Sequence, residues 1–107
     1  MNAVEEIEAA IAKLSELRDY ATPGPWASYK WDWRIVVAGQ GDDDNAEVIF
    51  DSRHHGDGEL VEVLHRTIDA QLAILGRGLE ILRTSMGKAE TAVELQIMLA
   101  RAINGTS

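Results

Sequence analysis

The chain has 107 residues, 46% of them hydrophobic, a composition and length that fit one small folded domain over residues 1–107. Its net charge of -8 argues against DNA or RNA as a ligand, because binding to phosphates requires clustered Lys and Arg. No apolar run approaches the about 20 residues of a membrane span, and the N-terminus lacks the basic and apolar regions of a secretory signal, so we expect a cytoplasmic protein with no membrane partner.

The first predicted element is an amphipathic helix at residues 3–19. Its apolar residues recur at spacings of three and four, which places them on one stripe: Val4, Ile7, Ile11, Leu14 and Leu17. Asn2 is expected to cap the first turn, with Glu5 three residues later in the capping-box position. The stripe predicts a helix that packs on a hydrophobic core.

A corner follows at Thr22-Pro23-Gly24-Pro25-Trp26. Each proline disfavours helical geometry in the residue before it, so the helix must end by about Tyr20 or Ala21. Trp26 then begins the next element.

Residues 26–52 are predicted to form an antiparallel β-hairpin. From Tyr29 to Ala38 large apolar residues alternate with polar ones, as in a strand with one buried face, and a second short strand fits Glu47 to Asp51. Glycines and aspartates between them favour a turn. Because a two-stranded hairpin is marginal alone, we expect it to lie against the helices or to pair with a second copy.

Three tryptophans, Trp26, Trp31 and Trp33, lie in this hairpin region. They could pack against helices, anchor a protein partner or stack on a small ligand. Trp31 and Trp33 share a strand face by their spacing and form the candidate interface, while Trp26 at the corner fits a core position. If binding is the function, one or more of the three should stay partly exposed.

The acidic residues concentrate in the middle of the chain, where residues 42–62 hold eight Asp or Glu against one Arg. The candidate oxygen and nitrogen ligands there are Asp42, Asp44, Glu47, His54, His55 and Asp57. They lack the calcium-loop spacing, and adjacent histidines on an extended chain point in opposite directions. We expect a solvated loop leading to a helix that Asp57 caps, with no metal or other cofactor. Cysteine is absent, which excludes disulfides and thiolate chemistry.

Residues 57–104 are predicted to be helical. A nearly unbroken apolar seam follows helical spacing and predicts one long helix: Val61, Leu64, Ile68, Leu72, Leu75, Leu79, Leu82 and Met86. Gly76 and Gly78 either permit close approach of another helix or mark a bend. A break is expected at residues 84–87, followed by a last helix from about Lys88 to Ile103 that is apolar on more than one face and ends at Asn104-Gly105.

No catalytic constellation stands out from these elements. His65 and Asp69 are four residues apart, as a base and its orienting carboxylate would be, but such pairs are ordinary on exposed helix surfaces. The glycines near Gly39 lack the length and the lysine of a phosphate loop. We therefore expect a protein that is not an enzyme and has no catalytic residues.

The stretch from Leu17 to Trp26, with its Ala-Thr-Pro-Gly-Pro-Trp sequence, resembles a recurrent opening in small proteins of actinobacteriophages and their hosts. The stretch from Leu60 to Leu75 looks like the first helix after the hairpin in such proteins. The two matches cover roughly residues 3–82, and they are similar, more loosely, to Ead-type accessory proteins of lambdoid phages. The resemblance implies a phage or prophage accessory protein of unassigned biochemistry, acting in the host cytoplasm.

The sequence thus predicts an α+β fold with an N-terminal amphipathic helix, a Trp-rich antiparallel β-hairpin and a C-terminal pair of helices. The function that we expect is protein binding, either to a host factor or to itself, most simply as a dimer through the C-terminal helices. Two alternatives stay open: an oligomeric protein that binds a small molecule or nucleotide signal in counter-defence, and an acidic mimic of DNA.

Overall fold

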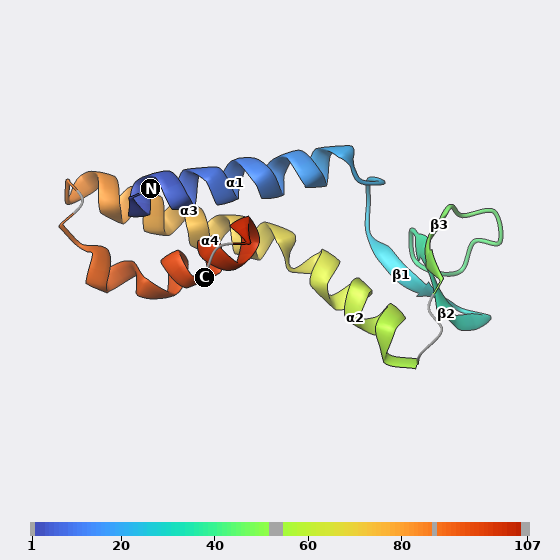
Figure 1. The fold of residues 1–107 in the computed structure, drawn as a ribbon. Helices are drawn as coiled ribbons and strands as arrows, with labels where there is room; N and C mark the ends of the chain where they lie inside the picture. Colours follow the sequence, from blue (N-terminus) through green and yellow to red (C-terminus); the bar gives the residue numbers. More distant parts are fainter. Residues whose placement is uncertain (1, 52–54, 87, 106–107) are drawn as a thin grey trace. The chain divides into compact units, whose positions relative to one another are not determined.

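A computed structural model of the chain describes residues 2–51, 55–86 and 88–105. The elements in chain order are α1 (Ala3–Tyr20), β1 (Trp26–Tyr29), β2 (Asp32–Ala38), β3 (Val48–Asp51), α2 (His55–Arg66), α3 (Ile68–Thr84), the 3-10 helix η1 (Glu90–Val93) and α4 (Glu94–Asn104) (Figure 1). The predicted α+β class is confirmed, with an N-terminal helix, an antiparallel sheet and C-terminal helices.

The chain divides into two compact units. The helical unit consists of Met1–Arg18 and Asp69–Ser107, and the sheet unit is Asp19–Ile68. Neither unit spans the whole chain, and the single domain expected over residues 1–107 stays a prediction.

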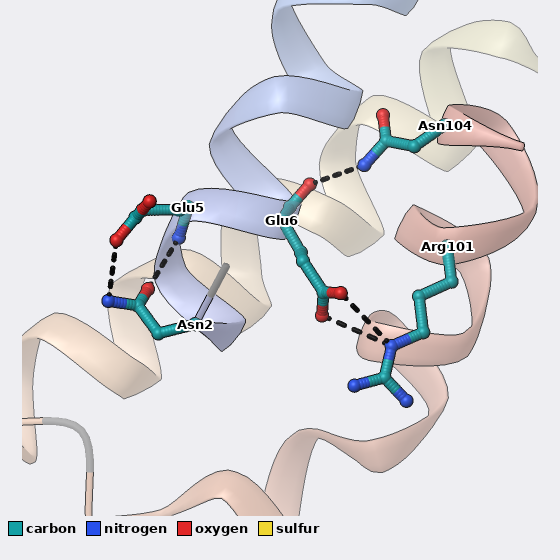
Figure 2. A network of polar contacts seen from close by, with 5 residues as sticks. All are labelled: Asn2, Glu5, Glu6, Arg101 and Asn104. Atoms are coloured by element: carbon teal, nitrogen blue, oxygen red, sulfur yellow. Dashed lines mark hydrogen bonds and ion pairs between the residues drawn. The ribbon is translucent and has the colours of Figure 1, made fainter. Parts of the chain in front are cut away.

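Helix α1 begins with the cap that the sequence predicts. The backbone N–H of Glu5 donates to Oδ1 of Asn2 at 2.9 Å, and Nδ2 of Asn2 donates to Oε1 of Glu5 at 2.8 Å (Figure 2). In a standard capping box the glutamate side chain accepts from the backbone N–H of the cap residue. Here Glu5 accepts from the side chain of Asn2 instead, and the two residues still donate a hydrogen bond to each other. The helix ends at Tyr20, before the first proline, as expected.

The helical unit has one hydrophobic core. The buried residues come from α1, α3, η1 and α4: Ala3, Ile7, Ala10, Leu75, Leu82, Val93, Ile97 and Ala100. Ion pairs join α1 to α3 near both ends of the helix pair, Glu8 with Arg83 at 3.5 Å and Arg18 with Asp69 at 2.9 Å. The pairing shows that the two helices run antiparallel.

Gly78 lets α4 approach α3 closely. A Cβ added at Gly78 would lie 2.8 Å from both Cβ and Cγ of Gln96, nearer than side chains tolerate. Gly76, by contrast, has open space at the corresponding position. Of the two roles proposed for these glycines, Gly78 takes the close-approach role.

The long apolar seam does not form one helix. Helix α2 ends at Arg66 and α3 begins at Ile68, with Thr67 between them. The Thr67 hydroxyl donates to the carbonyl oxygen of Leu64 at 2.8 Å, a local hydrogen bond that competes with helix continuation. The prediction of a single helix was wrong at this point, because Val61 and Leu64 belong to the sheet unit and Leu75 to the helical unit.

The other helix ends agree only in part with those predicted from the sequence. Helix α3 ends at Thr84, where the break was expected, and Gly87 lies outside the described residues. The last helix is divided into η1 and α4, and α4 ends at Asn104, followed by Gly105, whose φ of 76° is left-handed. Helix α2 begins at His55, so Asp57 lies within the first turn instead of capping it, and its charge still suits the helix dipole.

The sheet unit contains three antiparallel strands in the order β1-β2-β3. The predicted hairpin corresponds to β2 and β3, but the strand β1 was not foreseen, and the predicted strand from Tyr29 to Ala38 is split by a turn at residues 30–31. Helix α2 lies against the sheet. Val36 in the central strand β2 pairs with Ser28 and Phe50 and is fully buried, and the adjacent Val37 is buried as well.

Candidate functional site

Two exposed tryptophans lie at and beside the β1–β2 turn. Trp31 is 68% exposed and Trp33 is 48% exposed, and the ammonium of Lys30 lies 4.8 Å from the centroid of a Trp31 ring. We call these three residues, Lys30, Trp31 and Trp33, the aromatic patch. The expectation that some tryptophans stay exposed agrees with these values.

The strand register explains why the aromatic patch is exposed. Ser28 pairs with Val36, but the next residue, Tyr29, pairs with Asp32. Residues 33–35 therefore lie between two consecutive pairs of the ladder, an irregularity of the β-bulge kind, and such bulges redirect side chains. Trp31 lies in the turn and Trp33 in β2, so the expected common strand face was wrong.

The bulged stretch is held by an ion pair between Asp32 and Arg34. Nε and Nη2 of Arg34 donate to the two carboxylate oxygens of Asp32 at 3.0 and 2.9 Å, and the Arg34 backbone N–H donates to Oδ1 at 3.1 Å. The side-chain hydrogen bonds from Arg34, then its backbone hydrogen bond, lower the pKa of Asp32, while the pKa of Arg34 is raised by the same contact.

A pH-dependent stability should follow from this pair. Because the folded pKa of Asp32 lies below its ordinary value of 3.8, its contribution is complete above that value and is lost as the pH falls through the folded pKa. We expect Asp32→Asn to be less stable than the parent protein at neutral pH and the difference to shrink in acid. Urea unfolding at a series of pH values measures this. The exposed loop variant Asp42→Asn is the control, and a gap that persists unchanged at the most acidic pH would contradict the assignment.

The acidic loop between β2 and β3 is tied to the sheet. The hydroxyl of Tyr29 donates to Oδ1 of Asp44, and this hydrogen bond is the main cause that raises the pKa of Tyr29. The side chain of Asp43 accepts from the backbone N–H of Asn45 at 2.9 Å. Within residues 2–51, 55–86 and 88–105, no three His, Asp or Glu side chains are arranged to hold a metal. His54 lies outside these ranges.

Trp26 takes a different environment from the other tryptophans. Its ring stacks on His65 of α2, with centroids 3.7 Å apart and planes 7° from parallel, and its Nε1 donates to the carbonyl oxygen of Thr22 at 3.0 Å. Nearby, Ser28 Oγ donates to the carboxylate of Glu62 at 3.0 Å. Half-buried Trp26 thus joins the corner to α2, which agrees with its expected packing role.

The His65 and Asp69 side chains take separate partners. His65 stacks on Trp26, and its Nδ1 is buried without a hydrogen-bond partner, while Asp69 accepts from Arg18. His65 is half-buried, so the interpretation of the two as an exposed helical pair was wrong for it. The sequence did not indicate this stack, because Trp26 and His65 lie far apart in the chain.

No protein-family model, curated protein or solved structure matches this chain. In the described part of the chain, no helix has the length and apolar character that crossing a membrane requires.

Proposed function

We propose that the protein is a nonenzymatic accessory protein that binds a protein of its host through the aromatic patch. The observation that carries the proposal is the exposure of Trp31 and Trp33 beside Lys30. Tryptophan is enriched among the few interface residues that supply most of the binding free energy. The resemblance of the N-terminal segment to actinobacteriophage proteins supports the accessory class and an actinobacterial host.

The local backbone favours this use of the patch. A turn and an adjacent bulge present both tryptophans from a paired sheet, and the Asp32–Arg34 ion pair spans the bulge. A side chain held by a sheet loses less conformational entropy on binding than one on a free loop. The third tryptophan, Trp26, already stacks on His65, so it supports the sheet unit instead of the interface.

We expect Trp31→Ala and Trp33→Ala each to lose the host protein while keeping the fold. Loss of a tryptophan anchor costs about 2 kcal/mol or more, which is a fall in affinity of about 30-fold or more. Tagged protein is used to capture partners from an actinobacterial lysate, read by mass spectrometry, and thermal melting of each variant is compared with the parent. The melting temperature should fall by no more than a few degrees.

Tyr20→Ala is the matched control, because Tyr20 is an exposed aromatic residue outside the patch. Trp26→Ala should instead lower the melting temperature, since it removes the stack on His65. Folded Trp31 and Trp33 variants that retain every captured protein would refute the patch as the binding surface. A thermal-shift screen of nucleotide signals would then test the rival function.

A further inference from the structure

Helix α4 carries apolar side chains on two faces. Ile97 and Ala100 are buried in the core of the helical unit. On the outer side, Leu95 is 75% exposed and Met98 is 65% exposed. Ala102, four residues after Met98, is also exposed, so we call Leu95, Met98 and Ala102 the outer stripe. Spacings of three and four residues are typical of the seam between two packed helices.

Two opposite charges flank the outer stripe along the same edge. Glu94 directly precedes Leu95, and Arg101 directly precedes Ala102. Arg101 donates from Nε to both carboxylate oxygens of Glu6, at 3.2 and 3.1 Å, and its two terminal nitrogens point away from that carboxylate (Figure 2). The arginine is therefore oriented by α1 with donors left for a second carboxylate.

We propose that a second copy of this chain packs on the outer stripe, with the two α4 helices antiparallel about a two-fold axis. This register places Leu95 of each copy opposite Met98 of the other. The same register brings Glu94 of each copy beside Arg101 of the other, which forms two equivalent ion pairs. Parallel helices would place like residues at the same level and would not form these pairs, so the charges select the antiparallel dimer.

A surface groove beside the outer stripe fits the same arrangement. It has a volume of about 390 Å³ and is lined by Glu90, Thr91, Glu94, Ile97, Met98 and Arg101. Glu94 and Met98 of this lining, together with Leu95, border the position that Met98 of the second copy takes in this register. The dimer goes beyond the proposed function, because it uses the helical unit and none of the aromatic patch.

Charge reversal tests the register. Glu94→Lys and Arg101→Glu each place like charges at both pairs, so each variant alone should dimerise at least about tenfold more weakly in analytical ultracentrifugation. A mixture of the two variants should restore the two-chain mass, because both pairs then join opposite charges. Glu16→Lys is the control, because it makes the same change of charge as Glu94→Lys at an exposed position of α1. It should not weaken the dimer.

A second measurement does not depend on Arg101, whose replacement also removes the contact with Glu6. The chain has no cysteine, so a mixture of Leu95→Cys and Met98→Cys chains should form a mixed disulfide-linked dimer on mild oxidation. Trp31→Ala and Trp33→Ala should retain the dimer mass even where they lose a host protein. A monomer mass at high micromolar concentration, or a dimer that persists unchanged in both charge-reversed variants, would overturn the proposal.

Discussion

Leu75→Ala is expected to lower the free energy of unfolding by about 2 to 5 kcal/mol. Leu75 is fully buried in the helical unit, as the apolar seam predicted, and packs in one core with residues of α1, η1 and α4. Truncation removes buried methyl groups and leaves a cavity that the surrounding helices fill only in part, because protein interiors are closely packed. Urea unfolding followed by circular dichroism at the helical signal measures the loss.

Ile74→Ala is the matched control, since Ile74 precedes Leu75 on the same helix and is 47% exposed. Both substitutions introduce alanine into α3, so the gain in helix propensity is similar and the difference reports burial. We expect a loss for Ile74→Ala well below that for Leu75→Ala. Equal losses would show that burial in this core does not determine the stability of α3.

Gly41→Ala is expected to disrupt the sheet unit. A Cβ at Gly41 would lie 2.3 Å from the backbone carbonyl oxygen of Ser28, and the glycine has a φ of +91°. The obstacle is backbone within β1, so no side-chain rotation can relieve the overlap. A shift of Gly41 would also stretch the hydrogen bond that the Lys30 N–H donates to its carbonyl oxygen, now 2.7 Å long. Thermal unfolding followed by tryptophan fluorescence measures the effect.

Gly24→Ala separates the overlap from the backbone strain. Gly24 has a similar φ of +86°, but nothing lies within 4 Å of an added Cβ. Gly24→Ala should lower the free energy of unfolding only by the cost of a left-handed residue with a Cβ, about 1 to 2 kcal/mol. We expect a clearly larger loss for Gly41→Ala. Equal stability of the two variants would show that Gly41 does not lie this close to the backbone of β1.

Local signals in the sequence predicted the ends of several elements. Asn2 and Glu5 specify the start of α1, the two prolines require its end before Pro23, and Gly105 ends α4. Each of these depends on backbone groups or φ angles within a few residues. Such interactions form in the same way in almost any tertiary context, so they can be inferred from sequence alone.

Hydrophobic periodicity did not show where one element ends and the next begins, because the apolar positions of both elements follow the same spacing. The spacing of the apolar seam continues across Thr67, yet the chain leaves the helix there and divides the seam between α2 and α3. Alternation likewise continues from Tyr29 to Ala38, although a turn at residues 30–31 separates β1 from β2. A hydrophobic pattern gives the face of an element but not the partner against which that face packs.

The sequence by itself therefore determined the α+β class, the amphipathic faces and the caps, because these follow from local geometry and spacing. Only the tertiary structure decided which tryptophan is covered. Trp26, Trp31 and Trp33 are alike in sequence, but His65 of α2 stacks on Trp26, while the register jump from Ser28–Val36 to Tyr29–Asp32 leaves the other two exposed. Burial depends on contacts between residues far apart in the chain, and those contacts form only when the sheet and α2 have packed together.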